Sequence, residues 1–149
     1  MIGSKAQRPE NEIGEGPDNM WAWQQQSTYF VIEAKSGTTS NQGISRSDMG
    51  QMDQSIRWFA DTYIGQAAPI AIMIHKHKNL GERASPIPDM RVMCESELNS
   101  LKVAFQELCK SLGNGEAINS LDTISSLLRT HNFTPNQFIK TYTKPVITS

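Results

Sequence analysis

Two apolar segments rich in β-type residues, 29–34 and 69–75, lie on either side of a segment with helical periodicity. The second reads as a strand buried on both faces. Between them, apolar residues recur at offsets of four, seven and eleven, which places them on one face of a helix over residues 48–64. The residues of this stripe are Met52, Ile56, Phe59 and Tyr63. A strand, a helix and a further strand in this order predict an α/β fold.

The segment before the first apolar run predicts a β-hairpin. Residues 20–23 and 29–34 are expected to pair as antiparallel strands through the glutamine-rich turn 24–27. Residues 1–16 are polar and lack apolar periodicity, so they are expected to be irregular or partly extended, without a helix.

Further elements follow from local signals. Ser47 or Asp48 is expected to cap the helix over 48–64, and residues 90–94 are expected to form a short strand. In the last third, helices are expected over 98–112, over 118–128 and after a capping box at Thr134 and Gln137, with Phe138 and Ile139 on one side. We therefore divide the chain into an α/β core, residues 1–95, and a C-terminal helical extension packed on it, residues 96–149.

Composition limits the class of protein. With 149 residues the chain is long enough for one domain, and 14 Lys and Arg against 15 Asp and Glu give a formal charge of −1. No global positive field exists, so any contact with nucleic acid must be local. Cys94 and Cys109 lack CxxC spacing and a His partner, which favours reduced thiols over a disulfide or zinc site. No apolar run approaches the roughly 18 residues of a membrane span, and we expect a cytoplasmic protein without membrane contact.

Charged residues inside the first apolar run suggest chemistry. Because side chains alternate along a strand, Glu33 and Lys35 point to the same face, and Asp18 would add a second carboxylate if it ends a neighbouring strand. Two carboxylates suffice to hold Mg²⁺ with phosphate and water, and the backbone carbonyl of Ala34 could add a third ligand. The ion would activate water, and Lys35 would orient that water and offset charge on the phosphate. This set predicts hydrolysis of a phosphodiester bond.

The tripeptide Glu33-Ala34-Lys35 has a simpler reading as well. About one [DE]-x-K sequence is expected by chance in a chain of this length. An ion pair between Glu33 and Lys35 on the solvated face of an edge strand is therefore the alternative to a catalytic pair.

These residues resemble the PD-(D/E)xK superfamily of restriction-endonuclease-like nucleases. Pro17-Asp18 is similar to the first half of the family motif and Glu33-Ala34-Lys35 to the second, and Gln51 is similar in place to an accessory site glutamine. The resemblance covers about residues 14–95. It implies a restriction-endonuclease-like mixed β-sheet flanked by helices, Mg²⁺ or Mn²⁺ as cofactor, and DNA rather than RNA as substrate.

Four stretches are more narrowly similar to nuclease-type domains at the C-terminal end of bacterial helicases. They are residues 15–21, 32–37, 51 with 55–59, and 74–75. This similarity implies a helicase partner or parent chain, in a system that acts on foreign DNA or processes DNA. The family's opening helix has no evident counterpart in residues 1–16, so the chain is expected to be a C-terminal piece of a longer protein or to receive that element from a partner.

A basic loop follows the second apolar run. His75, at the end of that run, and Lys76, Lys78 and Arg83 after it are candidate nucleic-acid contacts, because basic side chains grip phosphates. A short basic loop is also common as plain solvated surface. Two rivals to the DNA nuclease remain: a non-catalytic nucleic-acid-binding or assembly module of a helicase complex, and an RNase with the same site.

Overall fold

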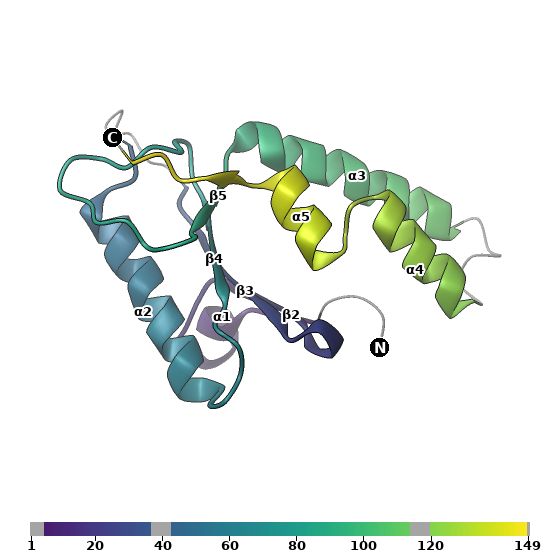
Figure 1. Ribbon diagram of the computed structural model, residues 1–149, viewed down its shortest axis with the longest axis horizontal. Coiled ribbons are helices and arrows are strands. Elements are labelled where there is room, and N and C mark those ends of the chain that lie inside the picture. The colour runs from purple at the N-terminus through teal and green to yellow at the C-terminus, as the bar shows by residue number, and fades with distance from the viewer. Residues whose placement is uncertain (1–4, 37–42, 114–119, 149) are drawn as a thin grey trace.

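The computed structural model of the protein describes residues 5–36, 43–113 and 120–148. An open six-stranded sheet forms its centre, in the order β1-β2-β3-β4-β5-β6 (Figure 1). The strands are β1 (Lys5–Gln7), β2 (Asn19–Trp23), β3 (Thr28–Ala34), β4 (Ile70–Ile74), β5 (Arg91–Met93) and β6 (Lys144–Pro145). The neighbours β3, β4 and β5 run parallel, and the other pairs are antiparallel. The predicted α/β class with a mixed sheet is confirmed.

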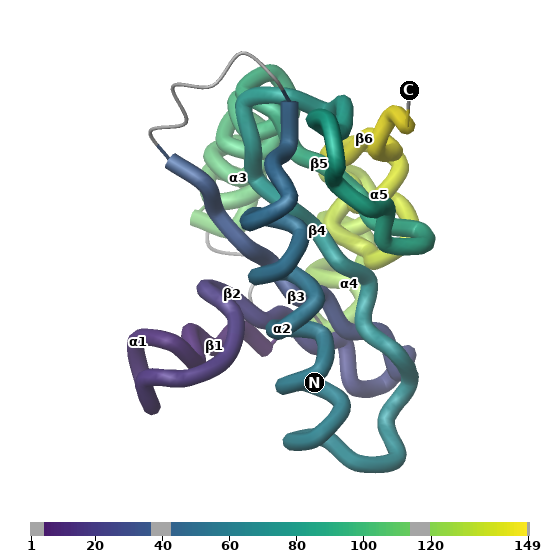
Figure 2. Tube along the Cα trace, turned by 90° about the vertical axis from the view of Figure 1, so that its left-hand side faces the viewer, coloured from purple at the N-terminus to yellow at the C-terminus, as the bar shows by residue number. Residues whose placement is uncertain are grey.

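Helices cover both faces of this sheet (Figures 1 and 2). Helix α2 (Arg46–Thr62) lies on one face, and the other face carries α3 (Glu95–Gly113), α4 (Leu121–Thr130) and α5 (Pro135–Tyr142). Because side chains alternate along β3, Val31 belongs to the core under α2, whereas Phe30 and Ile32 belong to the core under α5. The sheet therefore separates two hydrophobic cores.

The predicted hairpin of β2 and β3 is confirmed. The two strands pair from Trp23 opposite Thr28 to Asn19 opposite Ile32, and the short 3₁₀ turn η1 (Gln24–Gln26) joins them. This register places the start of β2 beside the end of β3.

The start of α2 differs from the prediction. Ser45 caps this helix, rather than Ser47 or Asp48, and its hydroxyl accepts the backbone N–H of Asp48 at 3.1 Å. The Asp48 carboxylate in turn accepts the Ser45 N–H, also at 3.1 Å. This capping box satisfies two helix-end donors at once, which is why the helix begins at Arg46.

Residues 1–16 are partly extended, as predicted, within the described part, but the prediction that they hold no helix is wrong. They form β1 and a five-residue helix, α1 (Pro9–Ile13), so an opening helix does precede Asp18. Pro9 starts α1 and is its one buried residue, and Gly14 ends it at φ 79°. A helix this short has no room for an apolar repeat, so periodicity could not reveal it.

The C-terminal third forms three helices and also returns to the sheet. Helix α3 begins at Glu95, three residues before the expected start. The next helix was expected over residues 118–128, of which residues 118 and 119 lie outside the described part. The Thr134 side chain makes no capping bond to the backbone, and its hydroxyl donates to Gln137 Oε1 at 2.6 Å. After α5, β6 pairs with β5 at the sheet edge. None of the helices among the described residues has the length and apolar character needed to cross a membrane.

Candidate active site at the end of β3

The hairpin register brings Asp18 opposite Glu33. Asn19 pairs with Ile32 across the antiparallel strands, so the residue before β2 faces the residue after Ile32. The Asp18 carboxylate accepts the backbone N–H of Ala34 at 2.7 Å. This bond fixes Asp18 at the end of β3 through the Ala34 N–H, while the role of the Ala34 carbonyl as a metal ligand stays a prediction.

Glu33 is the centre of a polar cluster beneath α2. Its side chain is only 8% exposed, and both of its carboxylate oxygens have partners. Oε1 accepts from the Ser55 hydroxyl at 2.6 Å, and Oε2 accepts from Lys35 Nζ at 3.0 Å. Lys35 Nζ also donates to Gln51 Oε1. Since Gln51 and Ser55 lie one turn apart on α2, a single helix face positions both members of the ion pair.

Glu10 joins this cluster, and sequence reasoning missed its role. A hydrogen bond with Asp18 and the negative charge of Asp18 raise the pKa of Glu10 above its ordinary value of 4.5, with smaller contributions from burial and from Glu33. The positive charge of Lys35 opposes the shift. The structure therefore gathers Glu10, Asp18, Glu33 and Lys35 within electrostatic reach. The available signal was Pro9 followed by an acidic residue and then Gly14, which marks a short helix.

The described residues hold no group of three or more His, Cys, Asp or Glu side chains placed to bind a metal ion. The carboxylates of Glu10 and Asp18 interact with each other, whereas both oxygens of Glu33 are engaged by Ser55 and Lys35. A metal ion held by Asp18 and Glu33 would share the Glu33 carboxylate with Ser55 and Lys35.

Gly16 and Pro17 explain why Asp18 sits where it does. Gly16 adopts φ +96°, and a Cβ atom there would lie 2.8 Å from the Trp58 ring. Pro17 is fully buried, and its carbonyl accepts the N–H of Glu10 at 3.3 Å. These contacts join α1, the start of β2 and α2 around the cluster.

Replacing Gly16 with alanine is expected to destabilise the fold more than the same change at Gly14. Both glycines have positive φ, which costs alanine about 1–2 kcal/mol, but only at Gly16 does the new methyl group meet another side chain, that of Trp58. Overpacking there adds about 1–3 kcal/mol. Chemical denaturation of Gly16→Ala and Gly14→Ala measures the difference. Equal losses of stability in the two variants would show that the Trp58 side chain moves aside at no cost in free energy.

A cleft of about 400 Å³ opens beside the cluster, between α1 and α2. Its lining is Glu10, Gly14, Glu15, Gly16, Gln54, Ser55 and Trp58. Ser55 is shared between this cleft and the hydrogen bond to Glu33. The cleft therefore meets the cluster at Glu10 and Ser55.

His75 lies next to the cluster. Lys35 N–H donates to the carbonyl of Ile74 at 2.9 Å, so His75 follows at the end of the neighbouring parallel strand. The imidazole is 3% exposed; its Nδ1 accepts the His77 N–H at 2.9 Å, and its Nε2 is buried without a hydrogen-bond partner among the described residues.

The basic loop after His75 contacts the C-terminal segment of the chain. Lys76, Lys78 and Arg83 are exposed, and the carbonyl of Lys78 accepts the N–H of Ile147 at 2.9 Å. This bond ties the loop to the C-terminal segment. Its role as a nucleic-acid contact stays a prediction.

Comparison of the chain with protein-family models, with curated proteins and with solved structures gave no match. The chemistry of the site therefore follows from its own residues.

Proposed function

We propose that this protein is a Mg²⁺-dependent nuclease that hydrolyses phosphodiester bonds, with DNA as the substrate and a helicase as partner or parent chain. One observation carries the proposal: Asp18 and Glu33 meet at one end of the hairpin, and Lys35 Nζ lies 3.0 Å from Glu33. A cluster of acids with one lysine beside an open cleft is what phosphodiester hydrolysis needs.

The donor set suits a hard divalent cation. Asp18 and Glu33 would hold Mg²⁺ together with the Ala34 carbonyl, and Glu10 stands close enough to Asp18 to join them. Mg²⁺ keeps several waters and needs only one or two carboxylates, so a complete protein cage is not required. The raised pKa of Glu10 reflects negative charge that a cation would offset. Bound Mg²⁺ would polarise the scissile phosphate and lower the pKa of a coordinated water.

The remaining polar residues would position the attack. Lys35 is the catalytic group that would orient the water and offset charge on the phosphate, as it turns from Glu33 Oε2 to the reacting atoms. Gln51 holds Lys35 and Ser55 holds Glu33, so both are positioning residues. Because both contacts come from α2, the spacing of lysine and carboxylate is set by one rigid element.

Calorimetric titration with Mn²⁺ and a plasmid-cleavage assay test the proposal together. The native protein is expected to bind Mn²⁺ and to cut DNA, and Asp18→Asn is expected to weaken Mn²⁺ binding at least about tenfold, because it removes a carboxylate ligand. Asp61→Asn, an exposed change on α2, is the matched control. Competition with labelled RNA separates a DNase from an RNase. Absence of both Mn²⁺ binding and cleavage would leave the non-catalytic assembly module as the better reading.

Glu10→Gln is expected to stabilise the metal-free protein at neutral pH while weakening Mn²⁺ binding. Because the folded state raises the pKa of Glu10, its ionised form opposes folding above that pKa, and this cost disappears below the ordinary value of 4.5. The variant should therefore melt at a higher temperature than the native protein at pH 7 and at the same temperature at low pH. Thermal melts across pH measure this, with the exposed change Glu82→Gln as control. A gain at neutral pH that persists under acidic conditions would show that repulsion from Asp18 is not its cause.

A further inference from the structure

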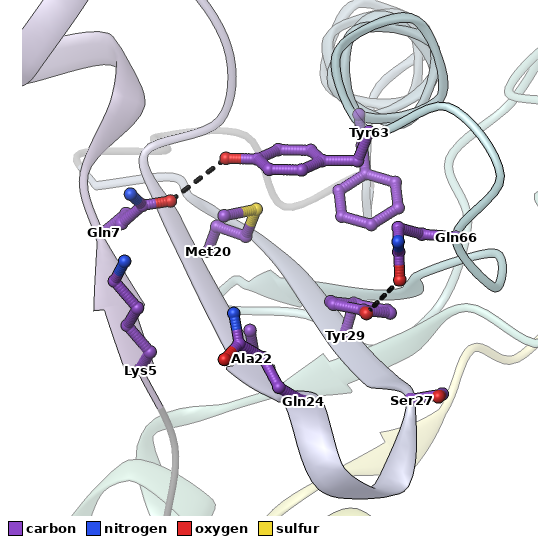
Figure 3. Close-up of a pocket in the computed structure, with 10 residues that line it drawn as sticks. Lys5, Gln7, Met20, Ala22, Gln24, Ser27, Tyr29, Tyr63 and Gln66 are labelled. Atoms are coloured by element: carbon purple, nitrogen blue, oxygen red, sulfur yellow. Dashed lines mark hydrogen bonds between the residues drawn. The ribbon is translucent and has the colours of Figure 1, made fainter. Parts of the chain in front are cut away.

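A second pocket lies on the same face of the sheet as the proposed active site, at the other end of β3. It has a volume of about 370 Å³ and lies between β1, β2 and the end of α2 (Figure 3). Met20 and Ala22 of β2 are among its lining residues, together with Tyr29, Phe59 and Tyr63. The ring centroids of Tyr29 and Phe59 lie 5.3 Å apart, and those of Phe59 and Tyr63 lie 5.1 Å apart. Phe59 is only 1% exposed and Tyr29 8%, so the aromatic wall that the pocket offers is mainly the half-buried ring of Tyr63.

Amide groups and one ammonium surround that wall. The hydroxyl of Tyr63 donates to Gln7 Oε1 at 3.1 Å, and that of Tyr29 donates to Gln66 Oε1 (Figure 3). Because each tyrosine engages the amide oxygen, the NH₂ groups of Gln7 and Gln66 remain to donate hydrogen bonds. Lys5, on the exposed edge strand, adds a cation. The pocket thus offers donors next to aromatic surface.

We propose that this pocket binds a nucleobase of the nucleic-acid strand on which the protein acts. The inference rests on the nuclease function proposed above. A nucleobase matches the lining because its faces are apolar and its edge carries hydrogen-bond acceptors. The backbone phosphate of the same nucleotide would lie within reach of Lys5, the cation of the pocket.

The geometry relates the pocket to the proposed site of cleavage. Helix α2 contributes Ser55 to the active-site cluster and Tyr63, at its C-terminal cap, to the pocket. Eight residues of helix span about 12 Å, the distance of a few nucleotides along a strand. The bound base therefore belongs to a nucleotide a few positions from the bond that is cut.

Abasic scanning tests the proposal without cleavage. A fluorescent single-stranded DNA 12-mer is titrated with the native protein in EDTA, with an abasic residue placed at each position in turn. One position is expected to show a loss of affinity of about tenfold, the size of one stacked base. In the variants Gln7→Ala and Gln66→Ala, the abasic residue at that position is expected to cause no further loss of affinity. Gln25→Ala is the matched control, because Gln25 is exposed next to the pocket residue Gln24 but does not line the pocket.

Two further measurements keep the test decisive. Tyr63→Phe removes only the hydroxyl that holds Gln7, so it replaces the alanine variants if these fail to fold. The ¹³C-methyl signal of Met20, a buried residue of the lining, should shift when the intact oligonucleotide binds and should not shift with the oligonucleotide that lacks the critical base.

The outcomes separate this inference from the nuclease. A flat abasic scan, an unmoved Met20 signal or no binding of the oligonucleotide overturns the base pocket, while metal-dependent cleavage by the same protein would leave the nuclease standing. A clear peak in the scan that depends on Gln66, in a protein that cuts nothing, supports the base pocket and overturns the nuclease alone. Equal behaviour of Gln66→Ala and Gln25→Ala places the base elsewhere and overturns the inference.

Discussion

Lys35→Ala is expected to lower the rate of Mg²⁺-dependent DNA cleavage by about 100- to 1000-fold, the usual cost of losing one charge-stabilising group in a reaction centre. Lys35 Nζ lies 3.0 Å from Glu33 Oε2, is held by Gln51, and forms the ion pair of the Glu33 carboxylate within the described part of the chain. The assay follows single-turnover cleavage of labelled duplex DNA. Lys140→Ala, an exposed change on α5, is the control.

Loss of Lys35 also affects the fold, and the two effects must be separated. Lys35→Ala leaves the buried Glu33 carboxylate without its cation, which destabilises the protein. The double variant Glu33→Gln with Lys35→Met removes both charges and keeps the hydrogen bond to Ser55. It is expected to recover most of the stability and none of the activity. Native-like cleavage by folded Lys35→Ala would remove Lys35 from the reaction and overturn its assigned role.

Phe138→Ala is expected to reduce the free energy of unfolding by about 3–5 kcal/mol, the cost of a large cavity in a core. Phe138 is fully buried, and its ring centroid lies 5.4 Å from that of Trp21, 5.5 Å from that of Phe30 and 5.2 Å from that of Tyr142. Its ring is thus the main contact of α5 with the sheet. Urea denaturation followed by circular dichroism and tryptophan fluorescence measures the loss.

Phe105→Ala provides the matched comparison. Phe105 lies on α3 and is 55% exposed, so its removal is expected to cost less than about 1 kcal/mol. If Phe138→Ala were as mild as Phe105→Ala, the C-terminal helices would not share a core with the sheet. If fluorescence and circular dichroism gave different midpoints for the Phe138 variant, these helices would unfold separately from the strands.

The strands β2 to β5 and the long helices were predictable because their signals are local. Alternation along residues 29–34 gave the two faces of β3, and the spacing of Met52 and Phe59 gave the buried side of α2. The glutamine-rich turn gave the hairpin. Helix boundaries were predicted less accurately. Ser45 caps α2 because Asp48 lies three residues after it and completes a capping box, whereas Gly50 stands three residues after Ser47.

The candidate site was predictable only in part. The spacing of Glu33 and Lys35 placed both on one face, and their ion pair has that geometry. Glu10 was not predicted as a site residue because its helix, α1, has only five residues and one buried side chain, too few for an apolar pattern. Ser55 is buried, and its hydroxyl donates to the Glu33 carboxylate. That pairing joins residues 22 positions apart, and no local signal encodes such a contact.

The amino-acid order by itself determined strands β2 to β5 and the long helices, because backbone preference and apolar spacing act over a few residues. Tertiary structure alone decided that Glu10, Asp18 and Glu33 share one end of the hairpin, and that β6 returns from the C-terminal segment to the sheet. The physical reason is that charge interactions and core packing depend on distance in space. The pKa of Glu10 rises only because folding brings Asp18 beside it.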